Sequence, residues 1–458
     1  MPTEAELKAQ VSVLAERLEV PGVAVGVISG DEEHVACAGV TSVEDPLPVD
    51  EGTLFQIGST GKTYTSTAIL ALVDDGKIDL DAPVRTYVPE LKLKDEQVAR
   101  DVTVLQLLNH TAGWDGDLFE DTGDGADALD KYVANMANIE QVTPLGATVS
   151  YNNASLGLAG LVLEKVTGKM YEQAVRELVL EPLGMSRSFF FAKETMTYRF
   201  ANGHKRSQDG TIEITRPWDM GRYAAPMGGM LAASVRDQVA WARFHMGDGT
   251  AADGTRVLSE ATLRRMQEPT AECPGNALGD AVGISWLIRD QDGLKVVAHG
   301  GDTVGQHSIF EMVPERTFAI TSLTNCGPNG GEFNEQIVRW AFENYLGADM
   351  SDPEPLRLDD DALAPYVGRY ETIAVIADIS AADGVLMVEV TVRPEVLEQL
   401  HEEPDDEPPV PLGILPGDGD RYIVPDGPAK GMKGYFTRGP DRKIDGIHIG
   451  GRFATRAG

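Results

Sequence analysis

The chain has 458 residues and a formal net charge of −33, and 42% of its residues are hydrophobic, which is enough for a large core or for two domains. So strong a negative charge excludes nucleic acid and anionic membrane surfaces as main partners. The three cysteines, Cys37, Cys273 and Cys326, lie far apart and form no C-x-x-C pattern or Cys/His cluster, so we expect no metal site.

The first residues, Met1 to Lys8, are polar and contain no basic segment followed by an apolar one, so no secretory signal is predicted. No apolar run reaches the length of a transmembrane helix. Sparse use of cysteine fits a reducing compartment. From these features we expect a cytoplasmic protein with no membrane partner.

Apolar residues recur along the chain at helical spacing or alternate as in strands, and turn residues separate the segments. In chain order the pattern predicts a helix over 4–18, strands over 23–28 and 35–40, helices over 64–74, 102–108, 156–167 and 234–246, strands over 294–298, 308–313 and 319–324, and a closing helix over 334–346. This order predicts an α+β fold, in which an antiparallel sheet takes strands from both ends of the domain and a helical insertion lies between them. A groove between sheet and insertion is a natural place for a site.

Composition changes at a segment rich in proline and acid, which we interpret as a linker over 349–357. It separates a larger domain, 1–348, from a smaller one, 358–458. The smaller domain has short alternating runs, such as 385–392 and 446–453, and an acidic loop over 402–409. These runs predict a small antiparallel β-barrel or sandwich.

A serine and a lysine, Ser59 and Lys62, stand three residues apart where a strand-like run gives way to a helical one. On the first turn of a helix this spacing puts both side chains on one face, so the lysine amine can accept the serine proton or hold a network that does. The helix N-terminus also offers backbone N–H donors to an oxyanion. Because the spacing is common by chance, its meaning depends on partners elsewhere in the chain.

A phenol and a carboxamide, Tyr151 and Asn153, lie two residues apart just before a helical segment. Near an ammonium such as that of Lys62, a tyrosine can have its pKa lowered and act as a proton shuttle. Asn153 can orient the lysine and the carbonyl side of a substrate. Taken alone, the segment favours another reading, in which the tyrosine packs its ring and the asparagine caps the helix.

A third motif, His299-Gly300-Gly301-Asp302, directly follows an apolar strand-like run. Two glycines in a strand are costly unless another backbone or a ligand approaches closely. The backbone N–H of Asp302, the residue after Gly301, can complete an oxyanion hole with that of Ser59. His299 can polarise the tyrosine or contact the substrate. The alternative is a strand-end turn beside a satisfied histidine.

Together these motifs run S-x-x-K, Y-x-N and H-x-G in order, and over residues 5–346 the chain resembles the serine β-lactamase and penicillin-binding-protein superfamily. It is most similar to the branch related to class C β-lactamases, which includes esterases, D-aminopeptidases and penicillin-binding-type thioesterases and transacylases. The trailing domain resembles the lipocalin-like barrel attached to some of these enzymes. Secondary segments agree with the resemblance: 76–83, 107–113, 181–185 and 226–230.

The resemblance implies that Ser59 is the nucleophile and Lys62 its activating partner. Tyr151 would be general base and then general acid to the leaving group, and Asn153 would position Lys62 or the substrate. His299 stands where many relatives carry lysine, a departure common in the esterase and aminopeptidase branches. It disfavours typical β-lactamase activity, because the Lys–Thr pair that usually engages a carboxylate is replaced by His299 and Gly300.

Two further residues carry predictions of their own. His110, in the segment Asn109-His110-Thr111, is interpreted as structural rather than catalytic, because the resemblance gives it a helix-to-loop role. Arg452, near the C-terminal end, is a candidate for reaching the groove and pairing with a substrate carboxylate. The alternative for Arg452 is an ordinary surface arginine.

The sequence therefore predicts a serine enzyme that forms an acyl-enzyme on an amide, ester or thioester of a small molecule or peptide, including peptides with a D-residue. With water as acceptor it is an esterase-like or D-aminopeptidase-like hydrolase; with an amine it is a transacylase or a cyclising thioesterase. No metal or organic cofactor is expected, and the oligomeric state is left open. The rival hypothesis is a non-catalytic ligand-binding or sensor protein on the same fold.

Overall fold

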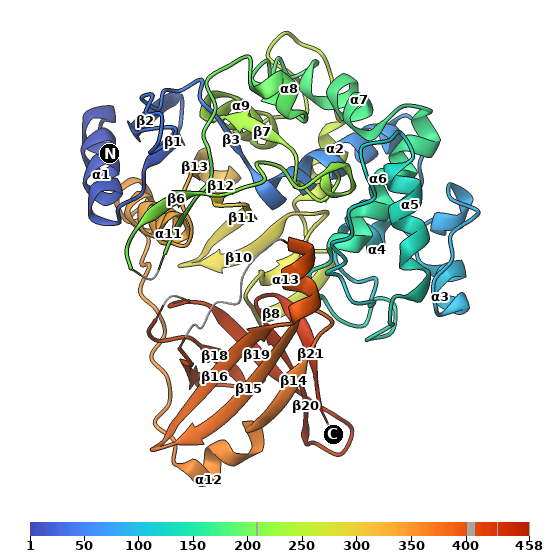
Figure 1. The fold of residues 1–458 in the computed structure, drawn as a ribbon, viewed down its shortest axis with the longest axis vertical. Helices are drawn as coiled ribbons and strands as arrows, with labels where there is room; N and C mark the ends of the chain where they lie inside the picture. The colour runs from blue at the N-terminus through green and yellow to red at the C-terminus, as the bar shows by residue number, and fades with distance from the viewer. Residues whose placement is uncertain (208, 401–407, 428, 458) are drawn as a thin grey trace.

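The computed structural model describes residues 1–207, 209–400, 408–427 and 429–457, so the predicted acidic loop over 402–409 lies almost wholly outside the described residues. Figure 1 shows a larger body of sheet and helices above a smaller β-barrel. We refer to residues 1–348 as the α+β region and to residues 358–457 as the barrel. Among the described residues, no helix combines the length and the apolar character needed to cross a bilayer.

The α+β region is built on one eight-stranded sheet in the order β2-β1-β13-β12-β11-β10-β9-β8, and every neighbouring pair is antiparallel. Its strands are β1 (Gly22–Ser29), β2 (Glu32–Gly39), β8 (Ala271–Asn276), β9 (Gly279–Val282), β10 (Leu287–Gln291), β11 (Leu294–Thr303), β12 (Gln306–Val313) and β13 (Phe318–Thr324). Strands from both ends of the region thus share one sheet, in which β1 pairs with β13, and this confirms the predicted α+β class.

Both faces of this sheet are covered. Strand β1 is buried along almost its whole length, and its side chains alternate between two apolar cores. Val23 and Val25 pack in the core under α1 (Glu4–Arg17) and α11 (Asn329–Ala341), whereas Ala24 and Ile28 face the larger core. That larger core includes α9 (Val235–Met246) and α2 (Gly61–Asp74) and continues into the helical insertion.

The insertion between β2 and β8 is mostly helical, as predicted. Its remaining helices are α3 (Glu96–Asp101), α4 (Val104–Leu108), α5 (Ala128–Asn135), α6 (Asn153–Thr167), α7 (Tyr171–Val175), α8 (Ala192–Thr195) and α10 (Glu260–Met266). Short 3-10 or π turns are η1 (Gly58–Thr60), η2 (Val84–Thr86), η3 (Met136–Asn138), η4 (Arg176–Leu180) and η5 (Arg222–Ala224). Two small sheets complete it, formed by β3 (Leu54–Gln56), β7 (Ala232–Ser234) and β4 (Ser188–Phe189), and by β5 (His204–Arg206) and β6 (Ile212–Ile214).

The C-terminal part is a closed eight-stranded antiparallel barrel, in which β14 pairs with β21 to close the ring. Aromatic side chains such as Tyr370, Tyr422 and Phe436 fill its interior. The strands are β14 (Gly368–Glu371), β15 (Val375–Ala382), β16 (Val385–Val392), β17 (Val410–Ile414), β18 (Arg421–Ile423), β19 (Lys433–Arg438), β20 (Ile444–Ile449) and β21 (Arg452–Arg456), with helices α12 (Asp360–Leu363) and α13 (Pro394–Leu400) and the turn η8 (Ala364–Tyr366).

Several boundaries differ from the predicted ones. The strand predicted over 294–298 continues to Thr303, because the two glycines stay extended and pair with β12. The closing helix begins earlier, at Asn329, and passes into a π turn, η7 (Phe342–Leu346). Strands β8, β9 and β10 were not predicted; they are short, and polar residues and glycines interrupt their alternation. A further turn, η6 (Pro314–Arg316), links β12 to β13.

Candidate active site

Ser59 lies in η1, directly before α2, so the predicted change from strand to helix occurs at this residue. Lys62 follows on the first turn of α2, with its Nζ 2.8 Å from Ser59 Oγ and 2.7 Å from the carbonyl oxygen of Met227. The Lys62 side chain is fully buried. Burial, and to a smaller extent the positive charge of Arg452, hold the pKa of Lys62 well below its usual range. Burial therefore favours the neutral form of the amine that lies beside the serine hydroxyl.

Glycines allow three backbone segments to meet around Ser59. A Cβ added to Gly301 would lie 2.1 Å from the carbonyl oxygen of Ile57 and 2.6 Å from the nitrogen of Ser59. A Cβ added to Gly228 would lie 2.0 Å from the carbonyl oxygen of Gly58, and Gly58 itself has a φ of +51°. These contacts are far shorter than a methyl group allows, so the serine turn is fixed by direct packing of backbone on backbone.

Strand β11 has an unpaired edge beside this turn. It pairs with β10 only as far as Ala298, and from His299 to Thr303 it pairs, within the described part of the chain, with β12 alone. A Cβ at Gly58 would lie 2.6 Å from the nitrogen of Asp302, so the strand edge packs against the serine turn. The two predicted oxyanion donors, Ser59 N–H and Asp302 N–H, are thus brought to the same turn.

The ring of Tyr151 is surrounded by basic side chains. Lys62 Nζ lies 4.8 Å from the ring centroid and the Arg452 guanidinium carbon 5.2 Å from it. The imidazole centroids of His110 and His299 lie 4.5 Å and 6.2 Å away. Burial raises the pKa of the Tyr151 phenol, and the neighbouring Ser59 hydroxyl and the Arg452 charge act in the opposite direction. At neutral pH the phenol keeps its proton in the free protein.

Asn153 is the first residue of α6, and the helix is capped by its neighbour Asn152, whose side chain accepts a hydrogen bond of 2.8 Å from the Ser155 N–H. The side-chain amide of Asn153 donates instead to Asp117 Oδ1 at 2.9 Å. Among the described residues, no hydrogen bond joins Asn153 to Lys62. The capping role considered for the asparagine therefore belongs to Asn152, and Asn153 is tied to a carboxylate that was not predicted.

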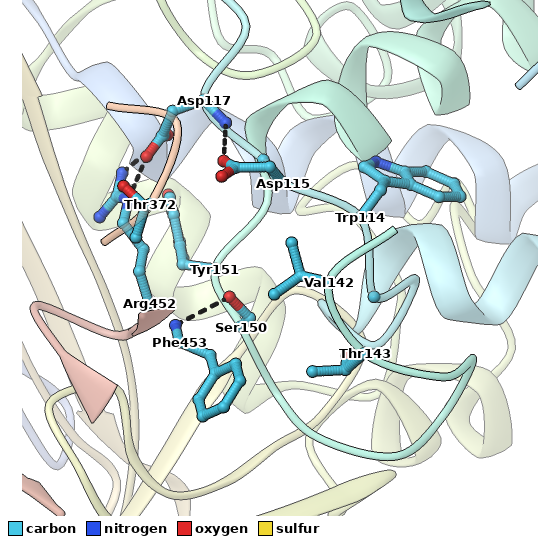
Figure 2. A pocket seen from close by; sticks show the side chains of 12 residues that line it. Trp114, Asp115, Asp117, Val142, Thr143, Ser150, Tyr151, Thr372, Arg452 and Phe453 are labelled. Atoms are coloured by element: carbon cyan, nitrogen blue, oxygen red, sulfur yellow. Dashed lines mark hydrogen bonds and ion pairs between the residues drawn. The ribbon is translucent and has the colours of Figure 1, made fainter. Parts of the chain in front are cut away.

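Arg452 reaches the site from the barrel, as Figure 2 shows. Its Nε donates to Asp117 Oδ2 at 2.5 Å and its Nη2 donates to Asp117 Oδ1 at 3.0 Å. The strand turn that carries it also holds the tyrosine loop: the Tyr151 N–H donates to the Gly451 carbonyl at 2.9 Å, and the Phe453 N–H donates to Ser150 Oγ at 3.1 Å. Arg452 therefore lies beside Tyr151 and pairs with a buried carboxylate, while 31% of its side chain is exposed; its position favours the predicted place at the site over an ordinary surface arginine.

A small recess lies between the two parts of the molecule beside Tyr151 (Figure 2). Asp115 anchors its rim, because Asp115 Oδ2 accepts a hydrogen bond of 2.7 Å from the Ile373 N–H of the barrel. Its walls are formed by residues 113–117, Val142, Thr143, Ser150 and Tyr151 of the α+β region and by Thr372, Arg452 and Phe453 of the barrel. The barrel therefore forms part of the wall next to the predicted proton shuttle.

The two histidines near Tyr151 have different surroundings. His110 supports the tyrosine backbone, because its Nδ1 accepts from the Asn152 N–H at 3.1 Å and its carbonyl accepts from the Ser150 N–H at 2.9 Å. His299 Nδ1 lies 2.6 Å from the Gly300 carbonyl and must donate to it, which leaves Nε2 as an acceptor. Burial lowers the pKa of His299 to about 3, so the ring is neutral.

A family model described as β-lactamase matches residues 10–343. Penicillin-binding protein 4 of Amycolatopsis lactamdurans is 33% identical over 360 residues, which covers 77% of this chain and 93% of that protein. The chain belongs to the β-lactamase family. It is accordingly an enzyme of the serine hydrolase type, and the predicted resemblance to the β-lactamase and penicillin-binding-protein superfamily is confirmed.

Solved structures extend the comparison to the whole fold of this β-lactamase family member. The crystal structure of SurE with D-Leu superimposes with a TM-score of 0.74 at 24% identity, over 99% of both chains. A class C β-lactamase from Rhodobacter sphaeroides gives a TM-score of 0.60 at 21% identity and covers 73% of this chain and 99% of its own. At these identities the likeness shows the fold alone, and for SurE it includes the barrel.

Two parts of this β-lactamase-type site were missed by sequence reasoning. One is the Met227 carbonyl, the second group bonded to Lys62; a backbone oxygen leaves no signal in a sequence beyond the glycines that let it approach. The other is Asp117, which binds both Asn153 and Arg452. It is one of several acidic residues between 115 and 124, and only the fold distinguishes it from them.

Proposed function

We propose that the protein is a serine acyl-transfer enzyme in which Ser59 attacks the carbonyl carbon of an amide, ester or thioester and keeps the acyl group as an ester on its Oγ. The observation that carries this proposal is the 2.8 Å approach of a fully buried lysine amine to the serine hydroxyl. An exposed lysine would be protonated at neutral pH and could not take a proton, whereas burial favours the neutral amine that can.

The burial of both groups supports a particular order of proton transfers. Burial favours the neutral Lys62 amine and the protonated Tyr151 phenol in the free protein, so in this order Lys62 takes the Ser59 proton as Oγ bonds to the carbonyl carbon. Tyr151 then gives its proton to the leaving nitrogen, oxygen or sulfur as the tetrahedral intermediate collapses, and Lys62 returns a proton to the phenolate. This order differs from the sequence-based prediction, in which Tyr151 acts first as the base.

The negative charge of the tetrahedral intermediate falls on the former carbonyl oxygen. Backbone N–H groups of Ser59 and Asp302 are the donors proposed to bind it, since Gly58 and Gly301 let the two segments pack together at the serine turn. A substrate laid along the edge of β11 that has no strand partner among the described residues, from His299 to Thr303, would add backbone hydrogen bonds of its own.

The acceptor that releases the acyl group is either water, which gives hydrolysis, or an amine, which gives a new amide. Arg452 supplies a positive charge beside Tyr151 suited to the carboxylate of a peptide or amino acid. SurE, which has the same overall fold, has been crystallised with D-Leu, and this supports testing peptides that carry a D-residue. His299 and Gly300, in the place of a Lys–Thr pair, argue against a specialised β-lactam hydrolase.

A fluorophosphonate probe tests the proposal directly. The probe should form a covalent adduct with the wild type, located on Ser59 by peptide mass spectrometry, and no adduct with the Ser59→Ala variant. If the wild type is not labelled, the rival hypothesis of a binding protein on this fold is favoured. Peptide esters, thioesters and amides with D-residues, offered with and without an amine acceptor, then distinguish hydrolysis from aminolysis by product mass.

A further inference from the structure

We infer that Asp117 is the positioning residue of this site, because one buried carboxylate holds both Arg452 of the barrel and Asn153 of α6 and so presents the arginine to a ligand carboxylate. The inference rests on the proposed function and deepens it. Asp117 is 7% exposed and receives three hydrogen bonds, one from Asn153 and two from Arg452. Figure 2 shows the carboxylate lying between the two parts of the molecule.

The donor pattern of Arg452 determines which edge of its guanidinium stays free. Nε and Nη2 form a two-pronged contact with Asp117, and Nη1 donates to the Gly450 carbonyl at 3.1 Å. A guanidinium has five N–H groups, so three are used, and one on each of Nη1 and Nη2 remains. The side-on contact with Asp117 leaves the end edge of the guanidinium, between Nη1 and Nη2, as a free fork that we infer takes one carboxylate of a ligand without any break from Asp117.

Asp117 also links that fork to the reacting groups. Asn153 shares Oδ1 of the same carboxylate, and its backbone N–H donates to the Gly116 carbonyl at 3.1 Å, so the loop of Asp117 and the start of α6 are fixed together. Tyr151 lies two residues before Asn153 with its ring 5.2 Å from the guanidinium carbon. A ligand carboxylate on the free fork is therefore held at a fixed position relative to the phenol.

Charge is the second effect of Asp117. The positive charge of Arg452 lowers the pKa values of Lys62 and Tyr151, and the negative charge of Asp117 raises both. The Arg452–Asp117 pair therefore presents oriented N–H donors to a ligand. The opposite charges of its two members largely offset each other in their effect on the pKa values of Lys62 and Tyr151. Without the carboxylate, Arg452 would lose its orientation and the pKa of Lys62 would fall further.

The ligand class that follows is an acylated amino acid or peptide with a free α-carboxylate. The first experiment measures binding alone, by calorimetry on the Ser59→Ala protein, with N-acetyl-D-leucine and its carboxamide as probes. In this background Asp117→Asn should reduce the affinity ratio of acid to amide by about tenfold or more, because the side-on fork is broken and the arginine turns. Asp115→Asn is the matched control on the same loop, because within the described structure Asp115 makes no hydrogen bond to Arg452 and asparagine keeps an oxygen that can accept from the Asp117 N–H; it should keep the ratio within about twofold.

The second experiment measures the pH dependence of kcat/KM with an uncharged ester as substrate, in protein that retains Ser59. Asp117→Asn should move the acid limb to lower pH, since the uncompensated arginine makes Lys62 easier to deprotonate. Arg452→Lys keeps the positive charge opposite Asp117 but cannot donate two parallel N–H groups to a carboxylate. It should therefore lower the acid-to-amide affinity ratio in the Ser59→Ala background. In protein that retains Ser59, it should leave the acid limb of the kcat/KM profile close to that of the wild type. A merely structural role of Asp117 would not produce this difference between the two variants.

Two results would overturn the inference: an unchanged affinity ratio in Asp117→Asn, or an acid limb that moves in Arg452→Lys but not in Asp117→Asn. Circular dichroism checks that each variant is folded, and if Asp117→Asn is not, an unchanged ratio in Arg452→Lys decides against the inference. Failure of the proposed function is a separate outcome, because it appears as missing fluorophosphonate labelling of Ser59, whereas the affinity ratio is measured without any chemistry.

Discussion

Two clusters meet at the proposed site, one held by backbone contact inside the α+β region and the other by hydrogen bonds between that region and the barrel. The Ser59 cluster consists of Ser59, Lys62, Gly58, Gly228 and Gly301. Its members are fixed by approaches that only glycine permits, and its lysine is fully buried. It contains no group from the barrel.

The Tyr151 cluster consists of Ser150, Tyr151, Asn153, Asp117 and Arg452. Its tyrosine loop is held by the barrel turn, and the arginine comes from the barrel itself. The difference teaches that a nucleophile can be built into one rigid region while the proton shuttle and the ligand-binding charge depend on domain docking. Damage to the first cluster should destroy the reaction, and damage to the second should alter its rate and selectivity.

The largest effect is expected from Lys62→Met in the Ser59 cluster. Methionine fills the same buried space but cannot accept a proton, so kcat/KM for an ester should fall by about 10²- to 10⁴-fold. The same change should raise the free energy of unfolding at pH 7. Burial lowers the pKa of Lys62 in the folded protein, so below its ordinary pKa the lysine binds a proton more readily in the unfolded chain, which favours unfolding of the wild type. Steady-state kinetics and urea denaturation test the two effects together; a variant that is both slower and less stable contradicts the account.

The next largest effect is expected from Gly301→Ala. The added methyl would lie 2.1 Å from the Ile57 carbonyl oxygen, so β11 and the serine turn must separate. A displacement of about 1 Å at such a site costs about 10²-fold in rate. Gly300→Ala is the matched control, because a methyl there meets only the Ser308 carbonyl oxygen, at 3.5 Å, and the loss should be much smaller. Equal losses in the two variants would show that close backbone packing is not what positions Ser59.

The same contrast explains how much the sequence could predict. Ser59 and Lys62 are three residues apart, so helical geometry alone brings them together, and Gly301, which packs against the serine turn, is visible as a costly residue in a strand. The overall class was predictable because strands at both ends of a region must pair in one sheet. These features depend on residues close together in the sequence or on the alternation of apolar and polar residues along strands.

The rest depends on contacts between distant segments. Asp117 and Arg452 are 335 residues apart, and nothing near either residue marks the other as its partner. The choice of Asn152 rather than Asn153 as helix cap depended on the boundary of α6, which patterns locate only to within a few residues. The short strands β8 to β10 form only because a neighbouring strand is present to pair with each of them.

A moderate effect is expected from Ser150→Ala in the Tyr151 cluster. It removes the acceptor of the Phe453 N–H, which should lower the free energy of unfolding by about 1 kcal/mol. The rate should fall only severalfold, because the Gly451 carbonyl still holds the Tyr151 backbone. Ser12→Ala, at an exposed serine of α1 that bonds the Lys8 carbonyl, is the control and should change neither quantity appreciably. If Ser150→Ala lowers the rate as much as Gly301→Ala does, the two clusters do not differ in the way described.

At pH 7.5 the smallest effect is expected from a change at His448, which separates the two clusters by their response to acid. His448 of the barrel is buried against the α+β region, with Nε2 3.4 Å from Thr148 Oγ1 and Nδ1 3.3 Å from Asn276 Nδ2. Burial lowers its pKa from the ordinary 6.5 to about 4. Between these values the unfolded chain binds the proton and the folded one does not, so stability is complete above pH 6.5 and falls as the pH drops toward 4.

At pH 5 this histidine alone should cost about 2 kcal/mol relative to pH 7.5, since each pKa unit corresponds to about 1.4 kcal/mol. His448→Gln stays neutral throughout, so the difference in its unfolding free energy between pH 7.5 and pH 5 should be smaller than that of the wild type by about this amount. Urea denaturation at the two pH values measures it. Because His448 lies at the junction that holds the Tyr151 loop, the variant should also retain more of its pH 7.5 activity at pH 5. If the wild type and His448→Gln lose the same unfolding free energy between pH 7.5 and pH 5, protonation of groups other than His448 causes the loss. The junction between the α+β region and the barrel would then not be the acid-sensitive part of the fold.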